Sequence, residues 1–376
     1  MKIAQVRTFP VRVPIDVDLA GLKARPTMSV CLVEVTTQSG ISGYGMTAIT
    51  QEGVVAHAIE HVAAPQLIGE DALNHERLWE KLYWTVSPRG QTGYASHVIA
   101  ALDTALWDIK GKALSLPVWR LLGGARDKVQ VYTTFGFPAF DREQLAAAAR
   151  HWLAQGHTRL KMVVGHQGLE RRDRGHSLES VIQEDILRVR AVRDAIGDDA
   201  SLYIDANCSL DGPHAARLCA GIADCDIRFF EEPITQNDAA QMADLRRRTG
   251  FALAAGQNEG LAFRFRDLLL AQAVDYLQPN VVISGGFTQS ARIAALAQAF
   301  QVPVINGGAW PYHNMHLQAG VANGTMVEYH YFSALVCQRL FRQLPEPKDG
   351  WLTLPSTPGL GFEPDFDTIR ELPRTS

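Results

Sequence analysis

Cysteine is scarce in this sequence, and the few cysteines present are not spaced for pairing. The 376-residue chain has five of them, an odd number, and no Cys-x-x-Cys motif occurs. These features argue against a disulfide framework and are typical of a reduced, cytoplasmic protein. The five are Cys31, Cys208, Cys219, Cys225 and Cys337.

Long apolar runs and an excess of charge of one sign are also absent. No stretch of about 18 uninterrupted apolar residues occurs, so no membrane-spanning helix is expected. The N-terminal stretch MKIAQVRTFPVRVPI contains no apolar run long enough for a signal peptide. The 36 Lys and Arg residues nearly balance the 40 Asp and Glu residues, which leaves a net charge of −4. Neither nucleic acid nor an anionic membrane is therefore expected as a partner.

Hydrophobic residues are plentiful, at 47% of the chain, and the length exceeds that of most single domains. Residues 1–126 are predicted to form an α+β domain. Strand-like runs and the turn at 38–40 favour an antiparallel meander there. Helical patterns follow, the clearest of them from His97 to Leu114.

From Val129 onward, short apolar runs alternate with amphipathic stretches. The strand candidates are VQVYTTFG, TRLKMVVG, SLYIDAN, IRFFEEP, FALAAGQ, DYLQPNVV, VPVINGG and TMVEYH. Eight strands with intervening helices predict a modified (β/α)8 TIM barrel over residues 127–335. The rival fold is an open doubly wound sheet, but neither GxGxxG nor GxxxxGKS/T follows the first strand. Residues 336–376 are rich in Pro and Gly and are expected to fold back onto the first domain.

Polar residues end three consecutive strand candidates of the predicted barrel. Asp205, Glu231 and Gln257 follow one another at intervals of 26 residues, which is one βα unit per step. Because the C-terminal ends of barrel strands face the active site, these side chains are expected to lie close together. Their oxygens suit a hard cation such as Mg2+, with Asn258 or Glu259 as alternatives for the third ligand. The other interpretation is that these residues only cap the next helix.

Six motifs are distributed along nearly the whole chain. They are AALDTALWDIKGKALSLPVWRLLGG at 100–124, DAN at 205–207, FFEEP at 229–233, AAGQN at 254–258, QPN...SGG at 278–286 and PGLGF at 358–362. In this order they resemble the mandelate racemase group of the enolase superfamily. The resemblance implies a capping domain on a barrel, Mg2+ at the ends of strands 3, 4 and 5, and removal of the proton α to a substrate carboxylate. It also implies a homo-oligomer, either a dimer or an octamer.

Four positions depart from the catalytic pattern of that family. The family carries Lys-x-Lys on strand 2, whereas this chain has Lys-Met-Val at 161–163. The usual Asp of strand 6 is Asn280, the usual His of strand 7 falls near Asn306, and the third metal carboxylate is Gln257. Racemisation needs a base on each face of the α-carbon, so these changes favour a dehydratase or a cycloisomerase, which need only one.

The base itself has more than one candidate. Lys161 qualifies if burial and a nearby Mg2+ depress its pKa, and its alternative role is electrostatic support of the substrate carboxylate. His313, just after strand 7, is the second candidate, although a histidine at a helix start is often structural. His330 on strand 8 is a third. The residues expected to bind the substrate are Asn207, Asn280, Asn306 and Glu328.

The favoured function is dehydration of an acid sugar, an aldonate or aldarate, through an enediolate. The alternatives are a cycloisomerase or other isomerase using the same chemistry, and a barrel that binds an acid without turning it over. With Gln257 as a ligand, the ligands and Mg2+ sum to zero charge, which favours a more anionic substrate such as a diacid.

Three segments outside the strand ends are expected near the substrate. The first is the charged run at 168–177, from which Arg171, Arg172, Arg174 or His176 could reach a carboxylate unless it is merely a solvated loop or subunit contact. The other two are capping-domain loops at about 16–27, with Lys23 and Arg25, and about 46–52, with Thr47 and Thr50. They are expected to exclude water and set specificity.

Overall fold

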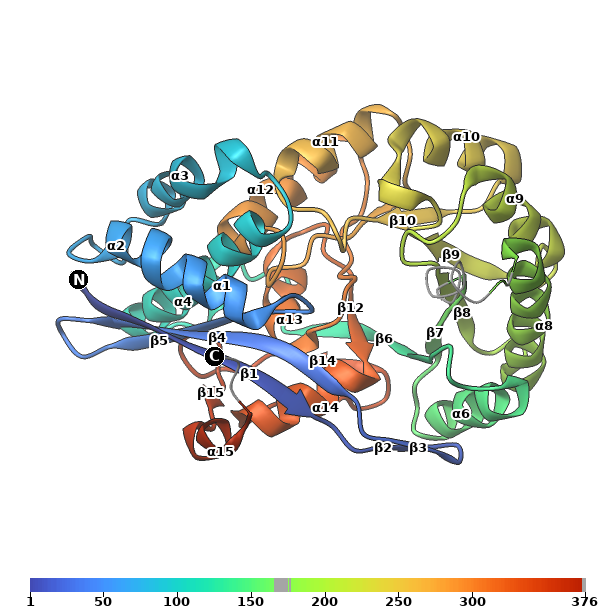
Figure 1. The fold of residues 1–376 in the computed structure, drawn as a ribbon, viewed down its shortest axis with the longest axis horizontal. Helices are drawn as coiled ribbons and strands as arrows, with labels where there is room; N and C mark the ends of the chain where they lie inside the picture. The colour runs from blue at the N-terminus through green and yellow to red at the C-terminus, as the bar shows by residue number, and fades with distance from the viewer. Residues whose placement is uncertain (166–174, 176, 374–376) are drawn as a thin grey trace.

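The computed structural model describes residues 1–165, 175 and 177–373, and Figure 1 shows how its elements are arranged. An antiparallel sheet opens the chain, with its strands in the order β1 (Ile3–Pro14), β4 (Thr27–Thr37) and β5 (Ser42–Ala48). A short hairpin of β2 (Val17–Leu19) and β3 (Leu22–Ala24) lies between β1 and β4 in the sequence. The predicted meander is therefore present.

Helices pack on this sheet and complete the α+β capping domain (Figure 1). They are α1 (Glu52–Ala58), η1 (Ile59–Ala63), α2 (Ala64–Leu67), α3 (His75–Val86), η2 (Ser87–Arg89), α4 (Tyr94–Leu114) and α5 (Val118–Leu121). The long helix α4 lies so close to β5 that a Cβ atom at Gly45 would be 2.0 Å from the carbonyl oxygen of Ala101. Only glycine allows this approach of strand and helix.

Parallel strands form the barrel that was predicted from the sequence. They are β6 (Lys128–Gly136), β7 (Arg159–Val163), β8 (Ser201–Asp205), β9 (Ile227–Glu231), β10 (Leu253–Ala255), β11 (Tyr276–Leu277) and β12 (Met326–His330). The eighth strand position, between β11 and β12, is reduced to bridges from Val304 to Leu277 and to Gly324. Because β12 pairs with β6, the barrel is closed.

Helices follow the strands around the outside of the barrel. They are α6 (Arg142–Ala154), α8 (Leu178–Ile196), α9 (Gly212–Gly221), α10 (Ala239–Thr249), α11 (Ala262–Leu270), α12 (Gly286–Ala299), α13 (Pro311–Gly320) and α14 (Tyr331–Leu340), with a short turn η3 (Thr235–Asn237) before α10. α14 spans the domain boundary expected at residue 335. Five of these helices begin at a side chain that accepts a hydrogen bond from a first-turn N–H, namely Asp141, Ser177, Asp211, Asp238 and His330. Within the described ranges, no helix combines the length and apolar character needed to cross a bilayer.

The C-terminal segment contacts both parts of the molecule. Its elements are β13 (Phe341–Arg342), β14 (Trp351–Thr353), β15 (Glu363–Pro364) and α15 (Phe366–Glu371). β14 pairs with the barrel strand β6. The ring of Phe366 lies 5.1 Å from that of Phe9 and 5.7 Å from that of Tyr44, both in the capping sheet.

A buried polar contact joins α4 of the capping domain to α12 of the barrel. Asp103 accepts hydrogen bonds from the backbone N–H of Thr288, at 2.9 Å, and from its hydroxyl, at 2.6 Å. The indole of Trp107 donates to the same hydroxyl oxygen at 2.9 Å. Burial raises the pKa of Asp103 to about 7, although these hydrogen bonds oppose the shift. The first sequence motif therefore contributes to the interface between the two domains.

Candidate active site

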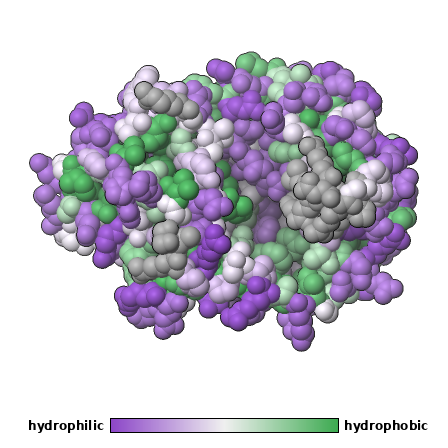
Figure 2. Space-filling view, viewed as in Figure 1, coloured by the Kyte–Doolittle hydropathy of each residue, from purple (hydrophilic) through white to green (hydrophobic). Residues whose placement is uncertain are grey.

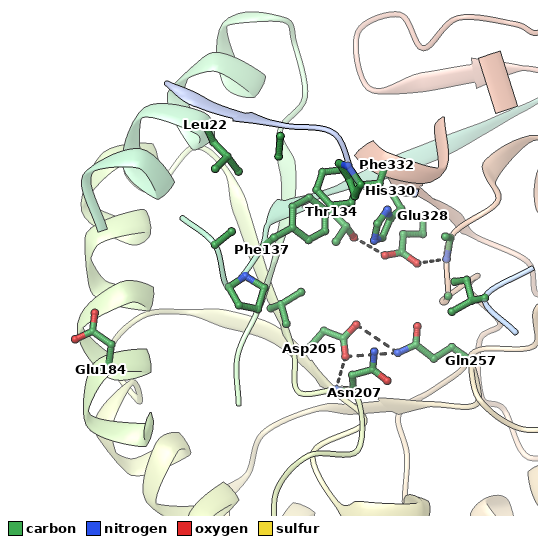
Figure 3. A pocket seen from close by; sticks show the side chains of 18 of the residues that line it. Leu22, Thr134, Phe137, Glu184, Asp205, Asn207, Gln257, Glu328, His330 and Phe332 are labelled. Carbon is green, nitrogen blue, oxygen red and sulfur yellow. Dashed lines mark hydrogen bonds between the residues drawn. The ribbon is translucent and has the colours of Figure 1, made fainter. Parts of the chain in front are cut away.

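A cavity of about 850 Å3 opens at the C-terminal ends of the barrel strands, beneath the β2–β3 hairpin of the capping domain. Figure 2 shows the hollow on this face of the molecule, and Figure 3 shows the residues that line it. Polar side chains from four different strands or strand ends face the cavity, namely Thr134, Asp205, Asn207, Gln257, Glu328 and His330. The strand ends therefore meet at one place, as expected for a barrel enzyme.

Lys161 on β7 lies just beneath this cavity, fully buried among carboxylates, and is not itself part of the described lining. Its Nζ is 3.0 Å from Asp205 Oδ2, 2.5 Å from Glu231 Oε2 and 3.0 Å from Glu328 Oε1. Burial by itself lowers the pKa of Lys161, but the three negative charges outweigh it and hold the pKa well above its usual value. In this arrangement Lys161 is an ammonium group. Burial raises the pKa of Glu328, but the positive charge of Lys161 outweighs it and leaves that pKa below its usual value.

The three expected metal ligands lie side by side. Asp205 and Glu231 are paired across β8 and β9, and the amide nitrogen of Gln257 donates to Asp205 Oδ2 at 3.3 Å and to Glu232 Oε2 at 3.2 Å. Glu231 Oε1 is buried without a hydrogen-bond partner. It faces space that exists because residue 307 is glycine, where a Cβ atom would be 2.9 Å from that oxygen.

The donor set fits a Mg2+ ion in its chemistry. The orphaned oxygen of Glu231, the carboxylate of Asp205 and the amide oxygen of Gln257 are the hard ligands that this ion prefers. Gln257 would have to turn its amide group, because its nitrogen faces Asp205 in the structure. In the described ranges, no three His, Cys, Asp or Glu side chains are arranged to hold a metal ion. A three-ligand site here therefore needs the amide oxygen of Gln257.

The two residues considered as alternatives for the third metal ligand, Asn258 and Glu259, contact other side chains. Glu259 forms an ion pair with Arg264 at 3.0 Å, and the amide of Asn258 donates to Glu232 Oε2 at 2.6 Å. Glu232 stands beside Glu231 at the end of strand 4 in the FFEEP motif, but the sequence assigned it no role. Its carboxylate accepts hydrogen bonds from both Gln257 and Asn258, so it orients the residues of the strand-5 end.

Asn280 and Asn306 do not line the cavity. The amide of Asn280 donates to the carbonyl oxygens of Gly307, at 2.7 Å, and Gly308, at 2.8 Å. The amide of Asn306 donates to Gly307 at 2.8 Å, and its oxygen accepts the N–H of Glu328 at 3.0 Å. Both side chains are fully buried and their polar atoms are used by the backbone. They position the loop that follows Asn306 instead of facing the substrate space.

His313 is also separate from this group. It lies in the first turns of α13, with its ring 5.5 Å from that of Phe341 and 5.0 Å from that of Phe362. Neither ring nitrogen has a hydrogen-bond partner among the described residues. Burial lowers the pKa of His313 to about 3. The helix turns this side chain toward the C-terminal segment, so the structure does not bring it to the cavity.

His330, the third histidine considered, does line the cavity (Figure 3). It ends β12 two residues after Glu328, and alternate residues of a strand point to the same side. Its Nδ1 accepts the N–H of Ser333 at 3.4 Å, which leaves the proton of the neutral ring on Nε2. Burial lowers the pKa of His330, and the charge of Glu328 opposes this shift.

The capping-domain loops reach the cavity with apolar side chains. Leu22 and Ile49 belong to the lining, whereas Lys23 and Arg25 are exposed. Lys23 is 3.5 Å from Asp18, and Arg25 forms an ion pair with a neighbouring carboxylate at 3.2 Å. The charged residues expected at 171, 172, 174 and 176 lie outside the described residues.

Two family models match the chain and together span most of it. The mandelate racemase / muconate lactonizing enzyme N-terminal domain matches residues 3–123, and the enolase C-terminal domain-like family matches residues 144–368. These matches agree with the capping domain and the barrel described above.

Individual relatives are similar over almost their full lengths. An arabinonate dehydratase from Saccharolobus solfataricus is 30% identical over 94% of this chain and 91% of its own. A 3,6-anhydro-alpha-L-galactonate cycloisomerase from Streptomyces coelicolor is 30% identical over 98% of this chain and 99% of its own. The crystal structure of a racemase from Streptomyces coelicolor A3(2) with bound magnesium has a TM-score of 0.87 at 28% identity, covering 98% of this chain and 99% of that one. This chain therefore belongs to the mandelate racemase / muconate lactonizing enzyme group of the enolase superfamily.

Proposed function

We propose that this chain is a Mg2+-dependent lyase that removes the proton α to the carboxylate of a sugar acid and eliminates the hydroxyl group at the β carbon. The observation that carries the proposal is the group of oxygen donors from Asp205, Glu231 and Gln257, beside Lys161, at the floor of the cavity. The named activity of the arabinonate dehydratase relative supports the same reaction.

The metal ligands in this proposal are Asp205, Glu231 and Gln257. A bound Mg2+ would act as a Lewis acid on the substrate carboxylate and stabilise the negative charge that develops when the α-proton leaves. Glu328 has both oxygens occupied, since it accepts the hydroxyl of Thr134 and the N–H of Ala309. Its role is to hold the ammonium group of Lys161 in place, close to the substrate.

Two side chains are assigned to proton transfer. Lys161 is assigned to receive the α-proton at Nζ. Mg2+ held by Asp205 and Glu231 would offset the carboxylate charge that stabilises the ammonium form, so that Lys161 could first lose a proton. His330 donates a hydrogen bond from Nε2 to the departing hydroxyl group, which leaves as water with a proton taken up from the solvent. The position of His330 in the cavity and its Nδ1 contact favour this role. His313 has no part in the reaction, because it is buried outside the cavity.

A cycloisomerase is the second candidate, and one observation favours it. The match to the cycloisomerase of Streptomyces coelicolor spans 99% of that protein. Its sequence identity to this chain, 30%, equals that of the arabinonate dehydratase. The two reactions share the removal of the α-proton and differ in whether water or an internal oxygen leaves. A homo-oligomer, either a dimer or an octamer, stays a prediction.

The test is a screen of aldonates, aldarates and anhydro-sugar acids with purified protein and Mg2+, followed by proton NMR in D2O. A 2-keto-3-deoxy product with deuterium at C3 is expected. Formation or opening of a ring without loss of water would support the cycloisomerase. If no acid in the panel exchanges its α-proton and none is consumed, the proposal fails and the acid-binding interpretation replaces it.

A further inference from the structure

The outer part of the cavity differs in character from its floor. Apolar side chains form the described wall above the polar strand ends, with Leu22 and Ile49 from the capping domain and Phe137, Pro138, Val163 and Phe332 from the barrel. Val163 occupies the position where the family carries a second lysine. A linear polyhydroxylated acid would find few hydrogen-bond partners along this wall.

Two aromatic rings give this wall a flat surface. The rings of Phe137 and Phe332 are stacked, with their centroids 4.1 Å apart and an interplanar angle of 23°. The ring of His330 lies 5.1 Å from that of Phe137, between this wall and the polar floor (Figure 3). An apolar group of the substrate placed beyond the reacting carbons would therefore meet an aromatic surface.

No cationic side chain faces this space from the described part of the wall. Leu22 lines the cavity, and the adjacent Lys23 points to the other side of the hairpin, as strand alternation requires. Lys161 is fully buried beneath the cavity and is not part of its described lining. Glu184, the charged residue at the rim, forms an ion pair with Arg142 at 2.5 Å. Among the described residues of the wall, the distal carboxylate of a diacid would meet no positive partner, contrary to the expectation based on Gln257.

We propose that the preferred substrate is a 2,3-dihydroxy monocarboxylate that carries an apolar ring or hydrocarbon group beyond C3, and that this group packs against the wall formed by Leu22, Phe137 and Phe332. The inference rests on the proposed function for the reacting end of the molecule. Burial of apolar surface in a preformed cavity supplies the binding energy.

A simple probe for this class is 3-phenylglycerate, in each of its stereoisomers. Its α-proton goes to the base, the C3–O bond breaks, and the hydroxyl group leaves with a proton as water. The resulting enol takes up a proton at C3 and becomes phenylpyruvate. The products are therefore phenylpyruvate and one water molecule, and no oxidant or reductant is needed.

The experiment measures dissociation constants by calorimetry for 3-phenylglycerate, D-arabinonate and galactarate with the Mg2+-treated protein. One stereoisomer of 3-phenylglycerate is expected to bind about tenfold or more tighter than either linear acid, as burial of a phenyl ring predicts. If a linear acid binds as tightly as the best stereoisomer, or if no stereoisomer binds, the inference is overturned.

A matched pair of variants tests the wall directly. Leu22→Lys is expected to weaken 3-phenylglycerate binding about fivefold or more and to strengthen galactarate binding, because it replaces apolar surface by a cation. Leu270→Lys is the control, since Leu270 is 64% exposed on α11 and does not line the cavity. Equal effects of the two variants would contradict the inference.

Failure of this inference is distinguishable from failure of the proposed function. Binding reports on the wall, whereas exchange of the α-proton in D2O reports on the chemistry. If 3-phenylglycerate binds tightly but no acid exchanges its α-proton, the apolar wall binds the substrate as proposed and the proposed reaction is refuted. If arabinonate is dehydrated but 3-phenylglycerate binds more weakly than arabinonate, the proposed reaction is supported and the preference for an apolar substrate group is refuted.

Discussion

At the scale of single residues, the charges around Lys161 determine how the candidate site can bind a metal ion and transfer a proton. Three carboxylates lie within 3.0 Å of its Nζ, and the neighbouring strand end supplies an amide, Gln257, instead of a fourth carboxylate. The site therefore offers a cation fewer negative ligands than the usual family pattern implies. Metal affinity and proton transfer should respond to single substitutions at these positions.

Gln257→Glu is expected to tighten Mg2+ binding by about tenfold or more, because a carboxylate attracts a divalent cation more strongly than an amide does. Calorimetric titration of the protein with MgCl2 measures the effect directly, without substrate. Gln298→Glu, at an exposed position on α12, is the matched control and should change nothing. An unchanged Mg2+ affinity of Gln257→Glu would remove Gln257 from the ligand set.

Lys161→Met should abolish exchange of the substrate α-proton in D2O, with a loss of about 100-fold or more, because no other base is assigned to that step. Methionine keeps most of the buried volume but leaves the carboxylates unpaired, so circular dichroism must establish that the variant is folded. Lys128→Met, at the start of β6 and away from the cavity, serves as the control. Retention of exchange in Lys161→Met would assign the base elsewhere.

His330→Gln is expected to separate the two chemical steps. Loss of its hydrogen bond to the leaving group should slow elimination about tenfold or more while α-proton exchange continues. The two rates are read from the same NMR sample in D2O, so folding and metal content affect both equally. A parallel fall in exchange and elimination would instead make His330 a binding residue or the base.

At the scale of elements, the interface of α4 and α12 fixes the capping domain over the barrel. The Thr288 N–H and hydroxyl both donate to Asp103, and residue 286 must be glycine, since a Cβ there would be 2.3 Å from Asp103 Oδ2. The cavity is built from both domains, so this junction also determines where Leu22 and Ile49 lie above the strand ends.

Asp103→Ala should lower the free energy of unfolding by about 1–3 kcal/mol, because it leaves the buried N–H of Thr288 without its acceptor. Urea denaturation followed by circular dichroism measures the change. Asp244→Ala, which removes only exposed ion pairs with Arg247 and Arg248, should cost less than about 1 kcal/mol. Similar losses in the two variants would show that the junction is not specifically stabilising.

At the scale of the whole molecule, buried neutral histidines couple folding to pH. Burial lowers the pKa to about 4 for His97 and His157 and to about 3 for His313 and His316. The unfolded chain binds these protons at a higher pH than the folded chain does, so protonation favours unfolding. Their contribution is complete above about pH 6.5 and is lost as the pH falls through about 4 for His97 and His157 and about 3 for His313 and His316.

The urea midpoint should therefore fall steadily between pH 7 and pH 5. Each of these histidines contributes up to about 1.4 kcal/mol per pH unit to the slope. His313→Phe removes one titrating group while keeping an aromatic ring against Phe341 and Phe362, so its slope should be smaller. His151→Phe, at an exposed position on α6, is the control. The same slope in both variants would mean that His313 is not buried as a neutral group.

The sequence by itself determined the barrel and the position of the polar strand ends. Alternating strands and helices specify which side of the barrel each strand end reaches, and the 26-residue intervals place Asp205, Glu231 and Gln257 on adjacent strands. Both features depend on local periodicity, which is written into the order of residues.

Only the tertiary structure decided which way the remaining side chains face. The sequence analysis placed His313 ahead of His330, but α13 turns His313 toward Phe362, whereas β12 presents His330 to the cavity. The amides of Asn280 and Asn306 are used by the loop backbone, and Lys23 points away from the cavity. These outcomes depend on contacts between segments far apart in the chain, which residue spacing does not encode.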